Sequence, residues 1–181
     1  FFGQGRLLQR PITAYLRELT KKGITFDYHN TMPFTIDGKL RSGVFELEGD
    51  VSSQYVTGLL FALPLLDGDS EIRMLSKLES KPYVDLTIAC LRHFGIAVQE
   101  TEQGYAVAGG QQYHACDLTV EGDYSQAAFF CVANALGSDI TLTNLNPESV
   151  QGDKKIVEIV REMCYNREQG LPAGFTVDSA D

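Results

Sequence analysis

The chain has 181 residues, 44% of them hydrophobic and 22% charged, a composition typical of a folded globular protein rather than a disordered chain. No stretch approaches the roughly 20 consecutive apolar residues of a membrane span, and the N-terminus lacks the layout of a signal peptide. Its 15 basic and 24 acidic residues give a net charge of −9 without any basic run, so we expect neither nucleic acid nor a membrane as a partner.

The first predicted helix lies within residues 10–19. A short alternating strand over residues 45–48 then leads into a helix over residues 52–66, whose apolar side chains recur at helical spacing. Either Ser52 or Ser53 is the natural N-cap of that helix.

Residues 71–75 alternate like a second strand. Pro82 then opens a helix over residues 82–94, at a position where its missing N–H is harmless. A hairpin of residues 96–99 and 105–107 follows. The predicted order of this unit is therefore strand–helix–strand–helix–strand–strand.

The unit recurs further along the chain. Three short motifs occur twice in the same order, with offsets of 73, 69 and 72 positions: Glu-Gly-Asp at 48–50 and 121–123, Glu-Ser at 79–80 and 148–149, and Gly-Ile at 23–24 and 95–96. The second copy predicts a helix over 126–136, a strand over 140–143 and a helix over 153–163. The sequence thus predicts an α/β (α+β) fold of tandem βαβαββ repeats of about 70 residues.

The four cysteines and three histidines are scattered, and no Cys/His pair has the spacing of a zinc site. We expect reduced cysteines, a cytoplasmic location, and neither a metal nor another cofactor.

Two predicted helix starts carry clustered polar side chains. Ser52, Ser53 and Gln54 lie at the first, and Ser80 and Tyr83 at the second. Helix starts attract anions because their N–H groups are unpaired and the helix dipole is positive there. Helix capping is the alternative use of these hydroxyls, and it accounts for one of the adjacent serines better than for both. Because both starts fall at the same end of their helices, they can face one pocket.

Four motifs together resemble the 5-enolpyruvylshikimate-3-phosphate (EPSP) synthase family over nearly the whole chain. They are Val51-Ser52-Ser53-Gln54, Ser80-Lys81-Pro82-Tyr83, Glu121-Gly122-Asp123 and Gln151-Gly152-Asp153. Tyr124-Ser125-Gln126 departs from the smaller residues usual there, with an effect that we expect on packing only.

The resemblance implies an enzyme whose two lobes, each of three such units, close on shikimate 3-phosphate and phosphoenolpyruvate and transfer the enolpyruvyl group with release of phosphate. It implies that residues 1–150 form part of one lobe and residues 151–181 a helix and a strand at the crossing between lobes. The family's general base and phosphate-binding cations would lie outside this chain. We therefore expect no catalytic residue here and no turnover without the remaining part of the same enzyme.

The resemblance also implies the substrate-binding residues, which coincide with the two helix starts. Shikimate 3-phosphate would contact Ser52, Ser53, Gln54, Ser80 and Tyr83, and phosphoenolpyruvate would contact Gln54. Two alternatives stay open. One is the related enolpyruvyl transferase that acts on UDP-N-acetylglucosamine, and the other is a repeat-built interaction domain without catalysis.

Overall fold

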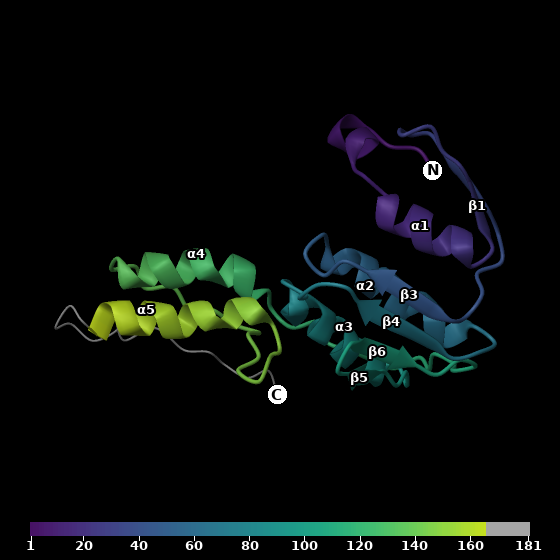
Figure 1. Ribbon diagram of the computed structural model, residues 1–181. Helices are drawn as coiled ribbons and strands as arrows, with labels where there is room; N and C mark the ends of the chain where they lie inside the picture. Colours follow the sequence, from purple (N-terminus) through teal and green to yellow (C-terminus); the bar gives the residue numbers. More distant parts are fainter. Residues whose placement is uncertain (166–181) are drawn as a thin grey trace. The chain divides into compact units, whose positions relative to one another are not determined.

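A computed structural model describes residues 1–165 of the chain (Figure 1). It divides into two compact units, Phe1–Cys116 and a second that begins at Asp117. The boundary predicted at residue 150 lies inside the second unit and concerns the lobes of a larger enzyme, so it stays a prediction.

The first unit is built on a four-stranded sheet in the order β3-β4-β6-β5. Strands β3 (Val44–Leu47) and β4 (Ser70–Met74) are parallel, and β6 (Gly104–Val107) runs antiparallel to β4. Strand β5 (Gln99–Thr101) pairs with β6 at the far edge. Alternate side chains of these strands point into the core, which includes Phe45, Leu47, Ile72, Tyr105 and Val107.

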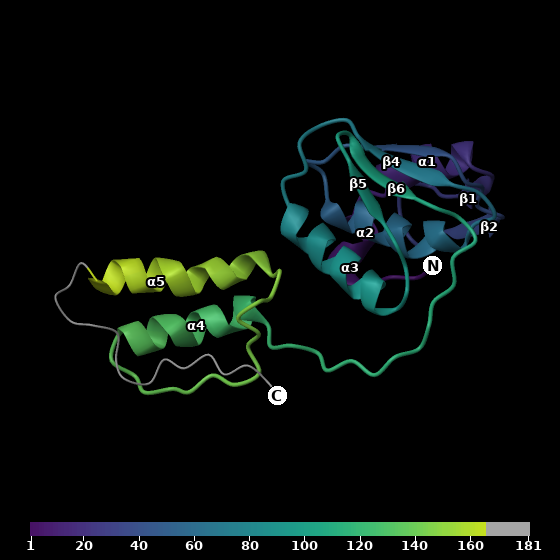
Figure 2. The ribbon, with the colours of Figure 1, turned by 90° about the horizontal axis from the view of Figure 1, so that it is seen from below.

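Two helices cover one face of this sheet (Figure 2). Helix α2 (Ser53–Ala62) continues into a short 3-10 turn, Leu63–Leu65, and α3 (Lys81–His93) packs beside it. Their buried apolar side chains recur every three or four residues and complete the core: Val56, Leu59, Leu60, Val84 and Leu91. The predicted order of two strand–helix steps and a hairpin is confirmed over residues 44–107.

One helix and two strands precede the four-stranded sheet along the chain. After a 3-10 turn, Gly5–Gln9, helix α1 (Thr13–Lys21) follows as predicted, and it contacts β3. Strands β1 (Ile24–Asp27) and β2 (Thr35–Gly38) then form a separate two-stranded sheet.

The second unit contains two helices that pack against each other, α4 (Tyr124–Ala135) and α5 (Ile156–Tyr165). A 3-10 turn, Gly152–Lys155, precedes α5, so the helix predicted over 153–163 starts as a tighter turn. Tyr124, Ala127 and Leu145 form a small core of this unit.

The strand predicted over residues 140–143 is not confirmed, since within residues 1–165 this segment contains only an isolated β-bridge, at Leu142. The side chain of Asn134 instead binds both backbone groups of Ile140, donating to its carbonyl at 2.7 Å and accepting from its N–H at 2.9 Å. The Ile140 N–H is therefore not available to a neighbouring strand. The α/β class is confirmed, while the repeat stays a prediction for the second unit, and the strand expected after α5 lies outside the described residues.

Candidate functional site

The start of α2 divides its two serines between different roles. Ser52 has an extended backbone, and its Oγ accepts a hydrogen bond from the Gln54 N–H at 3.2 Å, so Ser52 is the N-cap. Ser53 is the first residue of the helix, and within residues 1–165 its hydroxyl has no hydrogen-bond partner. Gln54 is exposed. Capping therefore accounts for Ser52 and leaves the Ser53 hydroxyl available to a ligand.

The start of α3 has a similar composition without the cap. Ser80 occupies the N-cap position, but its side chain makes no capping hydrogen bond. Pro82 in the first turn removes one backbone N–H that would otherwise need a partner. Tyr83 follows with a side chain that is 56% exposed. A half-buried hydroxyl and an accessible phenol therefore lie at this helix start.

A contact between the two helices shows how their starts are arranged. The Oγ1 atoms of Thr57 and Thr87 are 3.3 Å apart, and the Thr87 hydroxyl also donates to the Tyr83 carbonyl at 2.9 Å. Residues four apart lie on the same helix face, so Ser53 and Tyr83 lie on this seam, each one turn nearer its helix start. The geometry thus brings together the starts of both helices at the same end of the seam.

The sheet explains why both helices start there. Strands β3 and β4 are parallel neighbours, and each is followed directly along the chain by its helix. The carboxyl ends of parallel strands meet at one edge of a sheet, and the helices that follow them begin beside that edge. The positive dipole ends of two helices therefore face the same region.

Lys81 is the charged residue nearest this region in α3, and two carboxylates already bind it. Its Nζ lies 2.7 Å from Asp85 Oδ1 and 3.3 Å from Glu100 Oε1. The hydrogen bond to Asp85 is the main reason that the pKa of Lys81 is raised. Because its charge is compensated in this way, Lys81 adds little attraction for an anion, and the hydroxyls and N–H groups remain as the donors.

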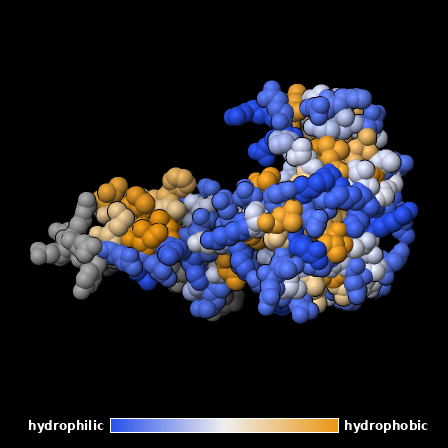
Figure 3. Space-filling model, in the orientation of Figure 1, coloured by the Kyte–Doolittle hydropathy of each residue, from blue (hydrophilic) through white to orange (hydrophobic). Residues whose placement is uncertain are grey.

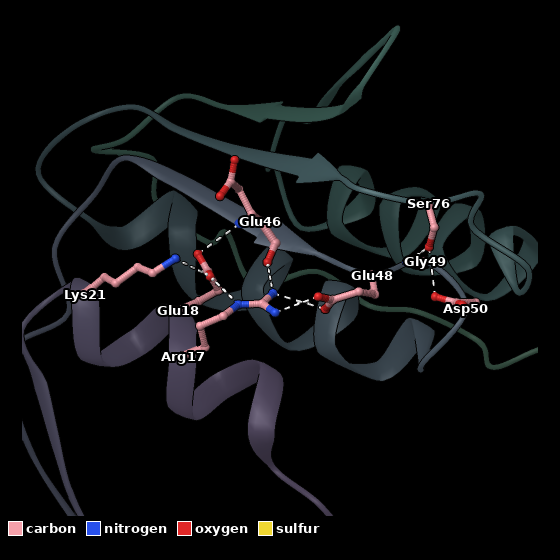
Figure 4. Close-up of polar contacts among 8 residues, drawn as sticks. All are labelled: Arg17, Glu18, Lys21, Glu46, Glu48, Gly49, Asp50 and Ser76. Atoms are coloured by element: carbon pink, nitrogen blue, oxygen red, sulfur yellow. Dashed lines mark hydrogen bonds and ion pairs between the residues drawn. The ribbon is translucent and has the colours of Figure 1, made fainter.

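The carboxylates before α2 belong to a network that ties helix α1 to strand β3 (Figure 4). Arg17 binds both carboxylate oxygens of Glu48, at 2.6 and 3.1 Å, and donates to the Glu46 carbonyl at 2.6 Å. Glu18, which is 1% exposed, accepts from the Glu46 N–H at 3.0 Å and from Lys21 at 2.9 Å. These groups are engaged in holding the fold, so none is placed to act as an acid or base.

In the second unit, side chains bind the N–H groups at the start of helix α4. Asp123 caps α4 by accepting from the Ser125 N–H at 2.8 Å, and Gln151 Oε1 accepts from the Tyr124 N–H at 2.9 Å. The Ser149 hydroxyl donates to Glu121 at 2.5 Å. Sequence reasoning missed the role of Gln151, because its partner lies 27 residues away and no local pattern indicates it. Of the three helix starts described here, those of α2 and α3 retain hydroxyls for a ligand, on Ser53 and Ser80, and that of α4 does not.

Other kinds of site find no support among residues 1–165. No three His, Cys, Asp or Glu side chains are grouped so that they could hold a metal ion there. None of the described helices combines the length and apolarity that a membrane crossing requires. The three cysteines whose side chains the structure describes, Cys90, Cys116 and Cys131, are free.

Comparisons with known proteins agree on one family. The family model described as EPSP synthase (3-phosphoshikimate 1-carboxyvinyltransferase) matches residues 1–179. The chain is 43% identical over 176 residues to a 3-phosphoshikimate 1-carboxyvinyltransferase of Clostridium beijerinckii, covering 94% of this chain and 40% of the relative. It is 46% identical over 171 residues to the enzyme of the same name from Clostridium kluyveri, covering 93% of this chain and 40% of that protein.

The solved structures support the same fold. EPSP synthase from Acinetobacter baumannii superposes with a TM-score of 0.71 at 24% identity, over 90% of this chain and 36% of that one. The chain thus spans about 40% of the length of the curated relatives that it matches.

Proposed function

The chain belongs to the EPSP synthase family, and on this premise we propose that it forms part of an enzyme that transfers the enolpyruvyl group of phosphoenolpyruvate to shikimate 3-phosphate. In this reaction the 5-hydroxyl of shikimate 3-phosphate attacks the enol carbon, a tetrahedral intermediate forms, and phosphate leaves. We propose that the role of this chain in the reaction is to bind shikimate 3-phosphate.

The observation that carries the proposal is the division of labour between the two serines at the start of α2. Ser52 satisfies the helix end, which leaves the Ser53 hydroxyl on the same seam as Tyr83, with Ser80 at the adjacent helix start. Hydroxyl donors beside two helix N-termini suit a phosphate group. We propose that Ser52, Ser53, Gln54, Ser80 and Tyr83 line this site, Ser52 through its backbone as the cap, and that Gln54 also contacts phosphoenolpyruvate.

The chemical step would depend on groups supplied by the remaining part of the same enzyme. Near the two helix starts, Lys81 is compensated by Asp85 and Glu100, and Glu48 is held by Arg17. A phosphate held by neutral donors alone is bound weakly, and we expect a dissociation constant on the order of 1 mM or worse for this chain by itself. We further propose a cytoplasmic location, and that residues 1–150 and 151–181 belong to different parts of the two-lobed enzyme.

The test uses the full-length enzyme that contains this chain. Calorimetric titration with shikimate 3-phosphate should show binding, and addition of phosphoenolpyruvate should then release inorganic phosphate. Titration with UDP-N-acetylglucosamine is the matched control and should show none. Binding of the nucleotide sugar in place of shikimate 3-phosphate would assign the chain to the other enolpyruvyl transferase, and binding of neither would favour an interaction domain.

A further inference from the structure

The loop between β4 and α3 packs directly on the Glu-Gly-Asp turn that precedes α2. The Glu79 N–H donates to the Gly49 carbonyl at 3.2 Å. A Cβ atom added at Gly49 would lie 2.6 Å from the Lys77 carbonyl oxygen and 2.7 Å from the Leu78 nitrogen, closer than a side chain can approach backbone atoms. The turn and the loop are therefore in contact through their backbones, which only glycine permits at position 49.

The hydroxyl of Ser76 links the loop to the turn through two hydrogen bonds (Figure 4). Ser76 Oγ accepts a hydrogen bond from the Gly49 N–H at 2.9 Å and donates its own hydrogen to Asp50 Oδ1 at 2.8 Å. A serine hydroxyl has one hydrogen to donate, so its donor capacity is fully used here. Ser76 lies two residues beyond the end of β4, and Gly49 two residues beyond the end of β3. The bridge thus joins the two strand ends just before each chain segment enters its helix.

We propose that Ser76 is a positioning residue that fixes the spacing between the starts of α2 and α3. The inference rests on the proposed function, because it assigns to this spacing the task of letting hydroxyls from both helices reach one phosphate. Donors of a binding site must be held within about 0.5 Å of their working positions by the residues behind them. Ser76 itself would not touch the ligand, and it acts on Ser53 and Ser80 through the segments that carry them.

The chain contains a matched control for Ser76. Ser70, at the opposite end of β4, is 5% exposed, and its Oγ accepts from the Gly43 N–H at 3.4 Å. Both serines thus join β4 to a glycine N–H next to β3, and they differ in that Ser70 is at the end away from the helix starts. Ser70→Ala removes one hydrogen bond from a glycine N–H and Ser76→Ala removes a corresponding one together with the bond to Asp50, but only Ser76→Ala loosens the proposed site.

The experiment compares Ser76→Ala, Ser76→Thr and Ser70→Ala in the full-length enzyme. We expect Ser76→Ala to raise the dissociation constant for shikimate 3-phosphate by about 3- to 10-fold, the effect of losing roughly one hydrogen bond between the protein and the ligand. Ser70→Ala should change it less than about twofold, and Ser76→Thr, which keeps the hydroxyl, should restore it to within about twofold. Equal affinities of Ser76→Ala and wild type, with a lower melting temperature, would overturn the proposal.

Hydrogen exchange separates this proposal from the proposed function. In Ser76→Ala, but not in Ser70→Ala, backbone amides of residues 49–54 and 77–83 should exchange faster, because the side-chain link is lost and only the Glu79–Gly49 backbone bond remains between these segments. If the wild-type enzyme does not bind shikimate 3-phosphate, the proposed function fails, and the exchange pattern still decides the role of Ser76. Unchanged exchange in both segments would show that Ser76 does not position them.

Discussion

Ser52 and Ser53 are adjacent in the chain, yet their hydroxyls have different environments at the start of α2. We predict that Ser52→Ala lowers the free energy of unfolding by about 1 kcal/mol through loss of the cap, with little change in affinity for shikimate 3-phosphate. Ser53→Ala should instead weaken substrate binding by about 1–3 kcal/mol, because a phosphate oxygen is left unpaired, and should leave the melting temperature nearly unchanged.

Both quantities are measured on both variants of the full-length enzyme, by thermal denaturation and by calorimetric titration. Each serine serves as the control for the other, since they have the same side chain and are consecutive residues. If Ser53→Ala melted at a lower temperature and bound shikimate 3-phosphate normally, Ser53 would be a structural residue only.

The carboxylate of Glu18 gives a pH-dependent prediction. Burial alone would raise its pKa, but the hydrogen bonds from the Glu46 N–H, Lys21 and Arg17 outweigh burial and hold the pKa below its ordinary value of 4.5. A carboxyl with a lowered pKa stabilises the folded state above its unfolded pKa, and this stabilisation is lost as the pH falls through the folded-state value. We predict that Glu18→Gln lowers the free energy of unfolding at pH 7 by about 1.5–3 kcal/mol.

The effect of Glu18→Gln on the melting temperature should depend on pH. The difference in melting temperature between wild type and Glu18→Gln should be constant above the ordinary carboxyl range and should narrow as the pH falls below 4.5. Glu102→Gln, at an exposed position of the β5–β6 turn, is the control and should melt like wild type at every pH. A difference for Glu18→Gln that persisted undiminished at pH 3 would contradict the role of its charge.

Helix α1 approaches α2 closely at a glycine of α2. A Cβ atom at Gly58 would overlap the Tyr15 hydroxyl, which itself donates to the Tyr55 carbonyl at 3.0 Å. Burial raises the pKa of Tyr15 to about 12, which agrees with its position between the helices. We predict that Gly58→Ala lowers the free energy of unfolding by about 1–3 kcal/mol, the usual range for overpacking.

The double variant tests the cause of this loss. With Tyr15→Phe the hydroxyl is gone, and the next atom of the ring lies 3.3 Å from the added Cβ, so Gly58→Ala should cost clearly less in that background. Tyr15→Phe alone should cost about 1 kcal/mol for the lost hydrogen bond. Strictly additive losses in denaturant unfolding would show that the two helices do not conflict at this point.

Elements with strong local signals could be predicted from the sequence, and elements that depend on distant partners could not. Helix α3 was predictable because Pro82 and regularly spaced apolar residues mark it. Strand β2, Thr35–Gly38, carries no such pattern, since all four residues are exposed. The strand predicted over residues 140–143 is not confirmed: within residues 1–165 only Leu142 forms a β-bridge, and the side chain of Asn134 binds the backbone of Ile140.

The same distinction holds for the candidate site. The two helix starts were predictable because serine followed by a helical pattern indicates an N-cap. Which serine caps α2 depends on backbone geometry and could not be decided from adjacent identical residues. The bonds of Ser76 to the turn before α2, and of Gln151 to α4, join residues 26 to 27 positions apart and leave no local trace in the sequence.

The second unit exposes several large apolar side chains (Figure 3). Six large apolar residues of this unit are between 42% and 77% exposed. Three lie in α4, one directly follows it and two lie in α5: Phe129, Phe130, Val132, Leu136, Ile159 and Met163. Surfaces of this kind usually contact another part of a protein. Because the chain spans about 40% of its relatives, we infer that the remaining part of the enzyme covers this face.

If this face is covered in the full-length enzyme, the 181-residue chain alone should expose more apolar surface than the full-length enzyme does. The 181-residue chain alone should bind the dye ANS strongly, and the full-length enzyme should bind it weakly, because the apolar face is covered there. Phe129→Glu in the 181-residue chain, at a side chain that is 72% exposed, should reduce the dye signal. Equal dye binding by the chain and the full-length enzyme would mean that this face is free in both.

The activity of the two proteins should differ as well. We predict that the full-length enzyme releases phosphate from its two substrates and that the 181-residue chain releases none. Loss of a single donor to the transition state typically costs about 10²–10³ in rate, and the chain alone would lack several charged groups. Steady phosphate release by the purified 181-residue chain would contradict this prediction.

The attachment of helix α1 to β3 has a consequence for association between molecules. Among the strands of residues 1–165, β3 is an outer strand of its sheet, and such strands can recruit a strand from a second molecule and begin aggregation. At Glu46 the N–H is bound by Glu18 and the carbonyl by Arg17, so an incoming strand cannot pair with this residue. Two side chains of helix α1, Arg17 and Glu18, thus hinder the addition of a strand to β3 at this point.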